Sequence, residues 1–382
     1  MTMKKTSTLF IALLLFLANN AHSQNHVGYR SPNPDNRNIG YVMAIQPRFD
    51  NVAVDFSEGL ASVLERRGQL HTYIETAGNP AFPAQYPNVG PFRNSIANVQ
   101  AEINAANYIY INKKGERITQ QQFPFGSDFS EGYAVVSVDV TGGGHYYRTY
   151  IDTEGKMVGK PRFQNANSFS EGYAAVRGSN ANWQVLNKRF VATSGYLPYD
   201  DIEEFHEGLA RVKVGDRYGF IDTTGKLIVP MMDTWCDRRF SEGLCVVKQG
   251  DRYGYMDMTG RIVISCRFTL AEPFSCSRAV VSTAGPGESG MITERGVIDH
   301  NGNWVVEERV FDGIMSFSED YAVVAKDGKY GFINVNGKIV IPMIYEKARS
   351  FHDDYAAVRV DGKWGFLKLT NVDPKAKLQR QR

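Results

Sequence analysis

The chain has 382 residues, of which 43 are lysine or arginine and 41 are aspartate or glutamate, so its formal net charge is +2. The excess comes from Lys4 and Lys5 at the start, and the rest of the chain is balanced. A balanced chain has no long-range field to gather nucleic acid or anionic lipid, so we expect no nucleic acid among its partners.

The first 23 residues have the parts of a secretory signal peptide. Lys4 and Lys5 form the basic start, an apolar run extends over 9–18, and Ala21 and Ser23 are the small residues before a cleavage site that we place after Ser23. The apolar run is too short to span a bilayer, which needs about 20 residues, and we find no transmembrane segment elsewhere. We therefore expect a periplasmic or secreted protein, in which residues 24–39 form a lead-in to the folded domain.

A short sequence motif, which we call the word, recurs along the chain. Its best copies read Phe-Ser-Glu-Gly, then Tyr or Leu, then Ala. The nine copies begin at Phe56, Phe92, Phe129, Phe169, Phe205, Phe240, Phe274, Phe317 and Phe351. This recurring period is typical of repeat proteins, whose units are too small to bury a hydrophobic face alone and must pack on their neighbours. The sequence thus predicts one repeat domain over residues 40–369.

The unit that begins at Phe205 shows the expected local structure most clearly. Residues 209–214 alternate between apolar and polar, which predicts a strand with one buried face, and residues 218–222 and 227–230 predict two more. Between the last two strands, Asp222 and Gly225 are placed for a tight turn in which Gly takes a positive φ. Each unit therefore supplies three short strands joined by two hairpin turns.

These residues resemble a known bacterial repeat. The order Lys-Trp-Gly-Phe (363–366), Ile-Asp-x-x-Gly-Lys (221–226), Val-Pro (229–230) and then the Phe word is similar to the WG or KWG repeat, over about residues 40–369. Most copies here have Tyr where that family has Trp, which keeps an aromatic anchor. The resemblance implies a β-rich, often exported protein with a binding role.

Two arrangements of such units are open. A propeller blade needs four strands in about 40 to 45 residues, whereas three strands in about 35 residues favour an open or superhelical stack. The alternative is a closed β-propeller. It is supported by the phase of the repeat, because the chain starts with a third-strand segment at 42–47 and ends with first and second strands at 356–369.

Two units carry extra residues at the same position. Ala134 and Ile151 are 17 residues apart and Ala279 and Ile298 are 19 apart, against 11 in regular units. Insertions at a fixed position of a repeat emerge on one edge, where repeat proteins commonly bind ligands. The sequence therefore offers His145, Tyr146, Tyr147 and Glu288 as candidate ligand contacts, with a plain loop extension as the alternative.

Trp235 is a further candidate ligand contact, because the link from 233 to 239 is one residue longer than its counterparts in other units. An exposed aromatic ring there would suit a protein or a glycan partner.

All four cysteines fall within 41 consecutive residues: Cys236, Cys245, Cys266 and Cys276. In an oxidising compartment this clustering suggests one or two disulfides with undetermined connectivity, and buried free thiols are the alternative. Cys245 replaces the Ala of the word and Cys276 replaces its Glu. No pair has the Cys-x-x-Cys spacing of a zinc site.

The sequence offers no catalytic constellation. The acids Glu58, Glu131, Glu171, Glu207 and Glu242 recur with the word, which indicates a structural task, and the histidines show no metal-ligand spacing. After the repeats, residues 370–382 form a basic tail that we expect to be disordered. We expect a non-enzymatic protein without cofactor or metal that binds another macromolecule, with a glycan-binding or glycan-active envelope protein as the alternative.

Overall fold

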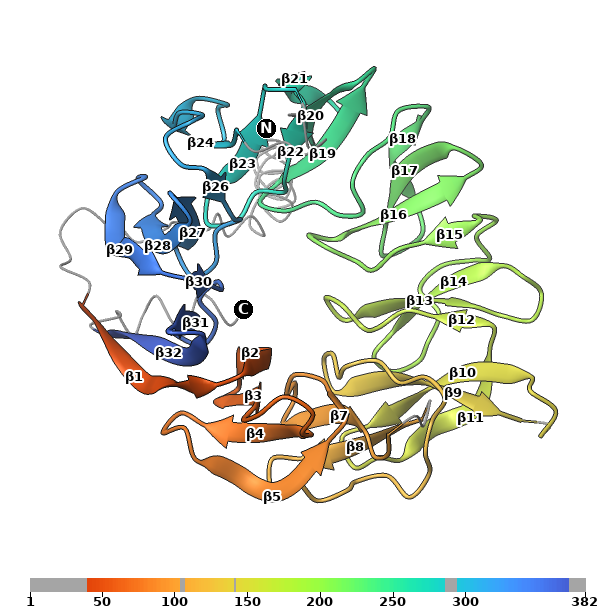
Figure 1. Ribbon diagram of the computed structural model, residues 1–382. Coiled ribbons are helices and arrows are strands. Elements are labelled where there is room, and N and C mark those ends of the chain that lie inside the picture. The colour runs from red at the N-terminus through yellow and green to blue at the C-terminus, as the bar shows by residue number, and fades with distance from the viewer. Residues whose placement is uncertain (1–39, 104–106, 141, 286–293, 371–382) are drawn as a thin grey trace, which may run out of the picture.

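The computed structural model describes residues 40–103, 107–140, 142–285 and 294–370. Within these ranges every regular element is a β-strand. The strands form nine small antiparallel sheets, which stand around a ring as blades (Figure 1). The fold is therefore a nine-bladed β-propeller, and the predicted all-β repeat is confirmed. The described residues include no helix of the length and hydrophobicity that a membrane span requires.

We number the blades in chain order. Blades 1 to 3 contain β2 (Asn51–Ser57), β3 (Leu60–Leu64), β4 (His71–Glu75) and β5 (Pro80–Tyr86); β6 (Asn88–Val89), β7 (Ile96–Gln100) and β8 (Tyr108–Asn112); and β9 (Tyr133–Asp139), β10 (Tyr146–Asp152) and β11 (Met157–Phe163). Blades 4 to 6 contain β12 (Asn165–Ala166), β13 (Tyr173–Arg177) and β14 (Trp183–Asn187); β15 (Asp201–Ile202), β16 (Leu209–Val214), β17 (Arg217–Asp222) and β18 (Leu227–Met232); and β19 (Leu244–Gln249), β20 (Arg252–Asp257) and β21 (Ile262–Phe268). Blades 7 to 9 contain β22 (Leu270–Ala271), β23 (Ala279–Ser282), β24 (Gly296–Ile298) and β25 (Trp304–Val306); β26 (Gly313–Ile314), β27 (Tyr321–Lys326), β28 (Lys329–Asn334) and β29 (Ile339–Tyr345); and β30 (Lys347–Ala348), β31 (Tyr355–Val360), β32 (Lys363–Thr370) and β1 (Gly40–Phe49).

Each unit has one strand more than the three that the sequence revealed. This additional strand comes first in the blade and precedes the Phe word. It lies nearest the centre of the ring, as β26 and β30 show in Figure 1. It is only two residues long in most blades, and in blades 3 and 6 it is reduced to single bridges, Gly126 with Val136 and Cys236 with Val247. Alternation cannot be seen in two residues. The expected open stack of three-stranded units is therefore wrong, and the closed propeller is correct.

The two ends of the described chain close the ring together. β1 pairs antiparallel with β32, with Gly40 opposite Thr370 and Met43 opposite Leu367. Blade 9 thus takes three strands from the end of the chain and its outermost strand from the beginning. The phase of the repeat in the sequence was the correct signal for this closure.

The hydrophobic core lies between neighbouring blades. The Phe of all nine words is at most 4% exposed. Phe205, for example, packs among Val185 and Leu197 of blade 4 and Ala210 of its own blade. Burial of such a side chain contributes about 1.5 to 3 kcal/mol. Each Phe therefore anchors a blade to its predecessor, as a repeat whose units cannot fold alone requires.

The word itself forms a two-residue hairpin turn. In blade 5, the backbones of His206 and Leu209 exchange hydrogen bonds of 2.9 and 3.1 Å, and Glu207 and Gly208 between them have φ of 54° and 80°. Positive φ at both central residues is the type I′ geometry that matches the twist of a hairpin. The Glu of the word therefore lies in the left-handed region together with the Gly that follows it.

Candidate functional site

The nine word turns lie on one face of the ring, which we call the word face. Because strands alternate in direction, this face also carries the turns between third and fourth strands, such as 222–226. The opposite face, which we call the loop face, carries the loops between second and third strands, such as 215–216, and the links from one blade to the next. Ligand contacts can therefore be considered face by face.

On the word face, the third residue of each word, which is acidic in seven of the nine blades, binds the next blade. The carboxylate of Glu171 accepts hydrogen bonds from the backbone N–H groups of Glu207 and Gly208, both at 2.7 Å. The same contact, with the side-chain acceptor named first and the backbone donor second, joins Glu58 to Ser95 (2.8 Å), Asn94 to Gly132 (3.0 Å), Glu131 to Gly172 (2.9 Å), Glu207 to Gly243 (2.8 Å), Glu242 to Ser277 (2.9 Å), Cys276 to Asp320 (3.3 Å), Glu319 to Asp354 (2.9 Å) and Asp353 to Gly59 (3.0 Å). The contacts run through all nine blades as a closed circle, which we call the word ring.

The serine of the word adds a second bond in the same direction. Its hydroxyl donates to the carbonyl of the next Phe in six blades: Ser57 to Phe92, Ser130 to Phe169, Ser170 to Phe205, Ser241 to Phe274, Ser275 to Phe317 and Ser318 to Phe351, at 2.6 to 2.9 Å. Arg93, His206 and His352 stand at this position in the other three blades. The repeated Ser and Glu are therefore part of the scaffold that joins the blades.

Four buried tyrosines form a third link between blades. The hydroxyl of Tyr150 donates to the carbonyl of Asn167 at 2.7 Å, and burial raises the pKa of this phenol well above its ordinary value. Tyr73 to Gly90, Tyr110 to Ser127 and Tyr255 to Glu272 repeat the contact at 2.6 to 2.8 Å. Each of these buried hydroxyls is thereby hydrogen-bonded, which avoids the cost of an unpaired polar group.

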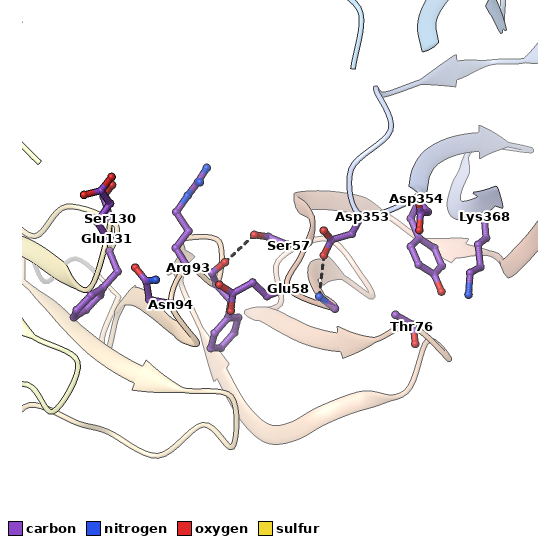
Figure 2. Close-up of a pocket in the computed structure, with 14 residues that line it drawn as sticks. Ser57, Glu58, Thr76, Arg93, Asn94, Ser130, Glu131, Asp353, Asp354 and Lys368 are labelled. Atoms are coloured by element: carbon purple, nitrogen blue, oxygen red, sulfur yellow. Dashed lines mark hydrogen bonds between the residues drawn. The ribbon is translucent and has the colours of Figure 1, made fainter. Parts of the chain in front are cut away.

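A cavity of about 830 Å³ opens on the word face where the turns of blades 9, 1, 2 and 3 meet. Its walls include Glu58, Arg93, Glu131, Asp353 and Lys368, as Figure 2 shows. The words of blades 2 and 9 depart most from the common pattern here. Glu58, Glu131 and Asp353 are already acceptors in the word ring, and the Arg93 side chain is 60% exposed, 3.8 Å from Asp128. The cavity is thus a polar recess framed by structural groups.

The structure places the predicted ligand contacts on the loop face. Tyr146 begins β10 and is 51% exposed, His145 precedes it and is also exposed, and Tyr147 is half-buried opposite Val138. Glu288 lies outside the described residues. Its insertion belongs to blade 7, which blades 4 to 6 separate from the insertion of blade 3. The strands that flank the two insertions, β9 and β10 in one case and β23 and β24 in the other, therefore belong to blades that are not neighbours.

Trp235 also lies on the loop face, in the link between blades 5 and 6, and is 41% exposed. Its ring meets that of Tyr253 edge to face, with centroids 5.9 Å apart, and its carbonyl accepts from the backbone N–H of Lys248 at 2.9 Å. The Lys248 ammonium lies over the Tyr253 ring. These contacts hold the Trp235 side chain in place while leaving much of it open to solvent.

Exposed aromatic side chains occur on the loop face in blades 3, 4 and 6. Among the described residues, the large aromatics classed as exposed are Phe125, Tyr146, Tyr196 and Trp235. Phe125 leads into blade 3, Tyr196 lies beside the start of β14 in blade 4, and Trp235 leads into blade 6. We call these four residues the aromatic patch. The sequence indicated Tyr146 and Trp235 but missed the other two, because no spacing anomaly marks them.

The structure holds all four cysteines as free thiols, so it contains none of the disulfides that the sequence suggested. Cys236 and Cys245 are buried in blade 6, Cys266 is partly buried in its outermost strand, and Cys276 accepts a bond in the word ring. Burial raises the pKa of the Cys276 thiol to about 11. No group of three potential metal ligands from His, Cys, Asp and Glu occurs in the ranges that the structure describes.

Together these features define a closed propeller whose blades are joined by a repeated polar turn. The WG containing repeat matches the chain nine times, over residues 43–66, 72–102, 110–139, 149–183, 199–218, 218–253, 253–285, 296–330 and 330–364. The chain belongs to the family of proteins built from this repeat.

Comparison with solved structures finds a similar fold in a protein described as the eukaryotic initiation factor, with a TM-score of 0.53 and 12% identity over 85% of this chain and 92% of that chain. BamB from Moraxella catarrhalis matches with a TM-score of 0.38 and 10% identity, over 61% of this chain and 82% of its own. At such identities the first similarity bears on the fold alone. A search of curated proteins found no match to the sequence.

Proposed function

We propose that this protein is an exported, non-enzymatic propeller that binds another protein through the aromatic patch on its loop face. The observation that carries the proposal is the placement of the exposed aromatic residues. All four lie on the loop face, two in blade 3, one in blade 4 and one at the entry to blade 6, and the word face has none among the described residues.

Aromatic side chains are enriched at protein interfaces because they bury a large area with few rotatable bonds. Tyr146 begins β10 opposite Asp139, and the residue after Asp139, Val140, is 54% exposed. Phe125 lies beside β9, where its carbonyl accepts a hydrogen bond from the backbone N–H of Ser137 at 3.0 Å. The Arg148 guanidinium lies over the Phe125 ring, with 4.5 Å between its carbon and the ring centroid. This cation contact fixes the ring and adds a charged rim of the kind that interfaces have.

The word ring supports the same proposal from the other side. Its carboxylates accept backbone hydrogen bonds, and the blades that it joins form a closed frame. A rigid frame presents loop-face residues at fixed distances, so less conformational entropy is lost when a partner binds. Export to the periplasm or exterior, which the first 23 residues predict, would give this surface an envelope or extracellular partner.

A glycan partner is the second candidate, because the exposed rings of Tyr146 and Trp235 could also stack on sugars. A glycan array with the purified chain separates the two candidates. Reproducible binding that is lost in both Tyr146→Ala and Trp235→Ala would favour the glycan. An array without signal, combined with cross-linking to a protein through the patch, would favour the protein partner.

Site-directed photo-cross-linking in the source cells tests the protein partner. A benzophenone amino acid is introduced at Tyr146 or Trp235, and the matched control carries it at Val263, an exposed residue of the outermost strand of blade 6. We expect one protein adduct shared by the two patch positions and absent from the control. Adducts of equal yield at position 263, or none from either patch position, would contradict the proposal.

A further inference from the structure

Two of the four cysteines meet in the inner hairpin of blade 6. Cys236 pairs with Val247 across the first two strands, and Cys245 lies two residues before Val247 on the same strand, so both side chains project to the same side of the sheet. Both residues belong to one core cluster with Phe240, and the Cys245 thiol contacts the backbone carbonyl of Asp237, the residue next to Cys236, at 3.7 Å. Cys236 is 0% exposed and Cys245 is 1% exposed.

The same two positions are equivalent in every blade, and only blade 6 fills both with cysteine. Elsewhere they hold Val52 and Ala61, Val89 and Ala97, Gly126 and Ala134, Ala166 and Ala174, Ile202 and Ala210, Ala271 and Ala279, Ile314 and Ala322, and Ala348 and Ala356. Ala and aliphatic residues at these positions show that packing alone needs no sulfur there.

The other two cysteines have different surroundings. The Cys266 thiol contacts the carbonyl of Val247 at 3.8 Å from the outermost strand of blade 6. The Cys276 sulfur accepts the backbone N–H of Asp320 at 3.3 Å in the word ring, in blade 7. Of the connectivities that the sequence left open, the structure therefore favours the pair Cys236 and Cys245, which lie on the same side of one hairpin and in one core cluster.

We propose that Cys236 and Cys245 form an intrablade disulfide when the chain folds in the presence of a disulfide oxidant. The two thiols lose two protons and two electrons as the sulfur–sulfur bond forms, and the oxidant disulfide takes them up and leaves as two thiols. Because both sulfurs are buried in the folded blade, exchange takes place before the blade closes. The bond ties the first strand of blade 6 to the second across the Phe240 word.

The test is oxidative refolding of the full chain in a mixture of oxidised and reduced glutathione, followed by unfolding in an alkylating reagent and digestion with trypsin without reductant. The four cysteines fall in separate tryptic peptides: 227–238, 240–248, 262–267 and 268–278. We expect the first two peptides to be joined and the last two to carry the alkyl group. The same chain refolded with dithiothreitol supplies the four alkylated peptides as reference.

Four alkylated peptides after oxidative refolding would overturn the proposal, and so would a bond that involves 262–267 or 268–278. A Cys266→Ser, Cys276→Ser double variant keeps only the proposed pair and must still give the joined peptides. This double variant leaves the core pair of blade 6 unchanged. It therefore tests the proposal even if single substitutions within that pair, Cys236→Ser or Cys245→Ser, prevent folding.

Discussion

The carboxylate of Asp353 accepts a hydrogen bond from the backbone N–H of Gly59 at 3.0 Å, although the two residues are 294 positions apart. This contact completes the word ring, since it links the last word of the chain to the first. The pairing of β1 with β32 closes the same junction at the periphery. The ring is thus closed by a hydrogen bond in the word ring and by strand pairing at its outer edge.

One link of the word ring is weaker than most others, because Cys276 offers a thiol where seven of the nine words offer a carboxylate. Cys276→Glu should raise the free energy of unfolding by about 1 kcal/mol, since hydrogen bonds to charged groups are stronger than those to neutral ones. The turn already accepts Glu in this conformation, and Glu319 makes the same contact to Asp354. Cys276→Ala should be destabilising. Urea unfolding of the original chain, the Glu variant and the Ala variant measures these differences in the free energy of unfolding. A Glu variant no more stable than the Ala variant would contradict a stabilising contact between position 276 and Asp320.

The buried tyrosine links make a second prediction. Tyr150→Phe should lower the free energy of unfolding by about 1 kcal/mol, because the partly buried carbonyl of Asn167 loses its hydrogen bond from the Tyr150 hydroxyl. Phe220 holds the equivalent place in blade 5, so the ring itself fits. Tyr196→Phe, at a residue 65% exposed, serves as the matched control and should leave the denaturation midpoint unchanged. Equal changes in stability for Tyr150→Phe and Tyr196→Phe would contradict a stabilising role of the Tyr150 hydroxyl.

The Asp side chains of three turns should make the protein less stable in acid. Partial burial raises the pKa of Asp222, but hydrogen bonds from the Thr224 hydroxyl and from backbone N–H groups outweigh burial and hold it below its ordinary value, and Asp257 and Asp299 behave alike. A lowered pKa in the folded state means that the stabilisation is present above the unfolded pKa of about 3.9 and is lost as the pH falls through the folded value.

The variant Asp222→Asn, Asp257→Asn, Asp299→Asn tests this origin of the acid sensitivity. Asn fits these turns, because Asn112 and Asn334 accept the same backbone bonds in their own blades. Thermal unfolding from pH 6 to pH 3 should show a smaller decline in melting temperature for the variant than for the original chain. Parallel declines would show that other carboxylates control the acid response.

The turn glycine gives a fourth prediction. Gly225 has φ of 83°, and a Cβ there would meet atoms of Leu197 and Ser194 at 2.9 Å. Gly225→Val should therefore destabilise the protein by about 1 kcal/mol or more. Gly215→Asn is the control, because nothing lies within 4 Å of that Cβ position and Asn tolerates its φ of 57°. An unchanged melting temperature for the Val variant would contradict the turn assignment.

Much of each blade could be predicted from the sequence. The alternation over 209–214 and the turn at Asp222 and Gly225 matched β16 and the β17–β18 hairpin, because these features depend on neighbours along the chain. The first strand was missed because Asp201–Ile202 is too short to show a period. The partner of Glu171 could not be predicted, since a periodic sequence does not say which backbone groups meet 36 residues later.

The candidate contacts were predictable only in part. The lengthened hairpin of blade 3 and the unusual link at Trp235 stood out as breaks in the repeat, and the structure places both on the loop face. Phe125 and Tyr196 lie in links and edge segments of ordinary length, where exposure depends on how neighbouring blades pack. The grouping of the four residues is a property of the ring and has no counterpart in the linear pattern.

Small-angle X-ray scattering of residues 40–370 in solution tests the closed ring most directly. A closed ring should give a compact particle with one symmetric maximum in its pair-distance distribution and a radius of gyration near the roughly 20 Å expected for a compact chain of this length. An elongated particle, with a distribution skewed toward long distances and a clearly larger radius, would mean that the nine units form an open stack. That result would contradict the Asp353–Gly59 contact and the pairing of β1 with β32.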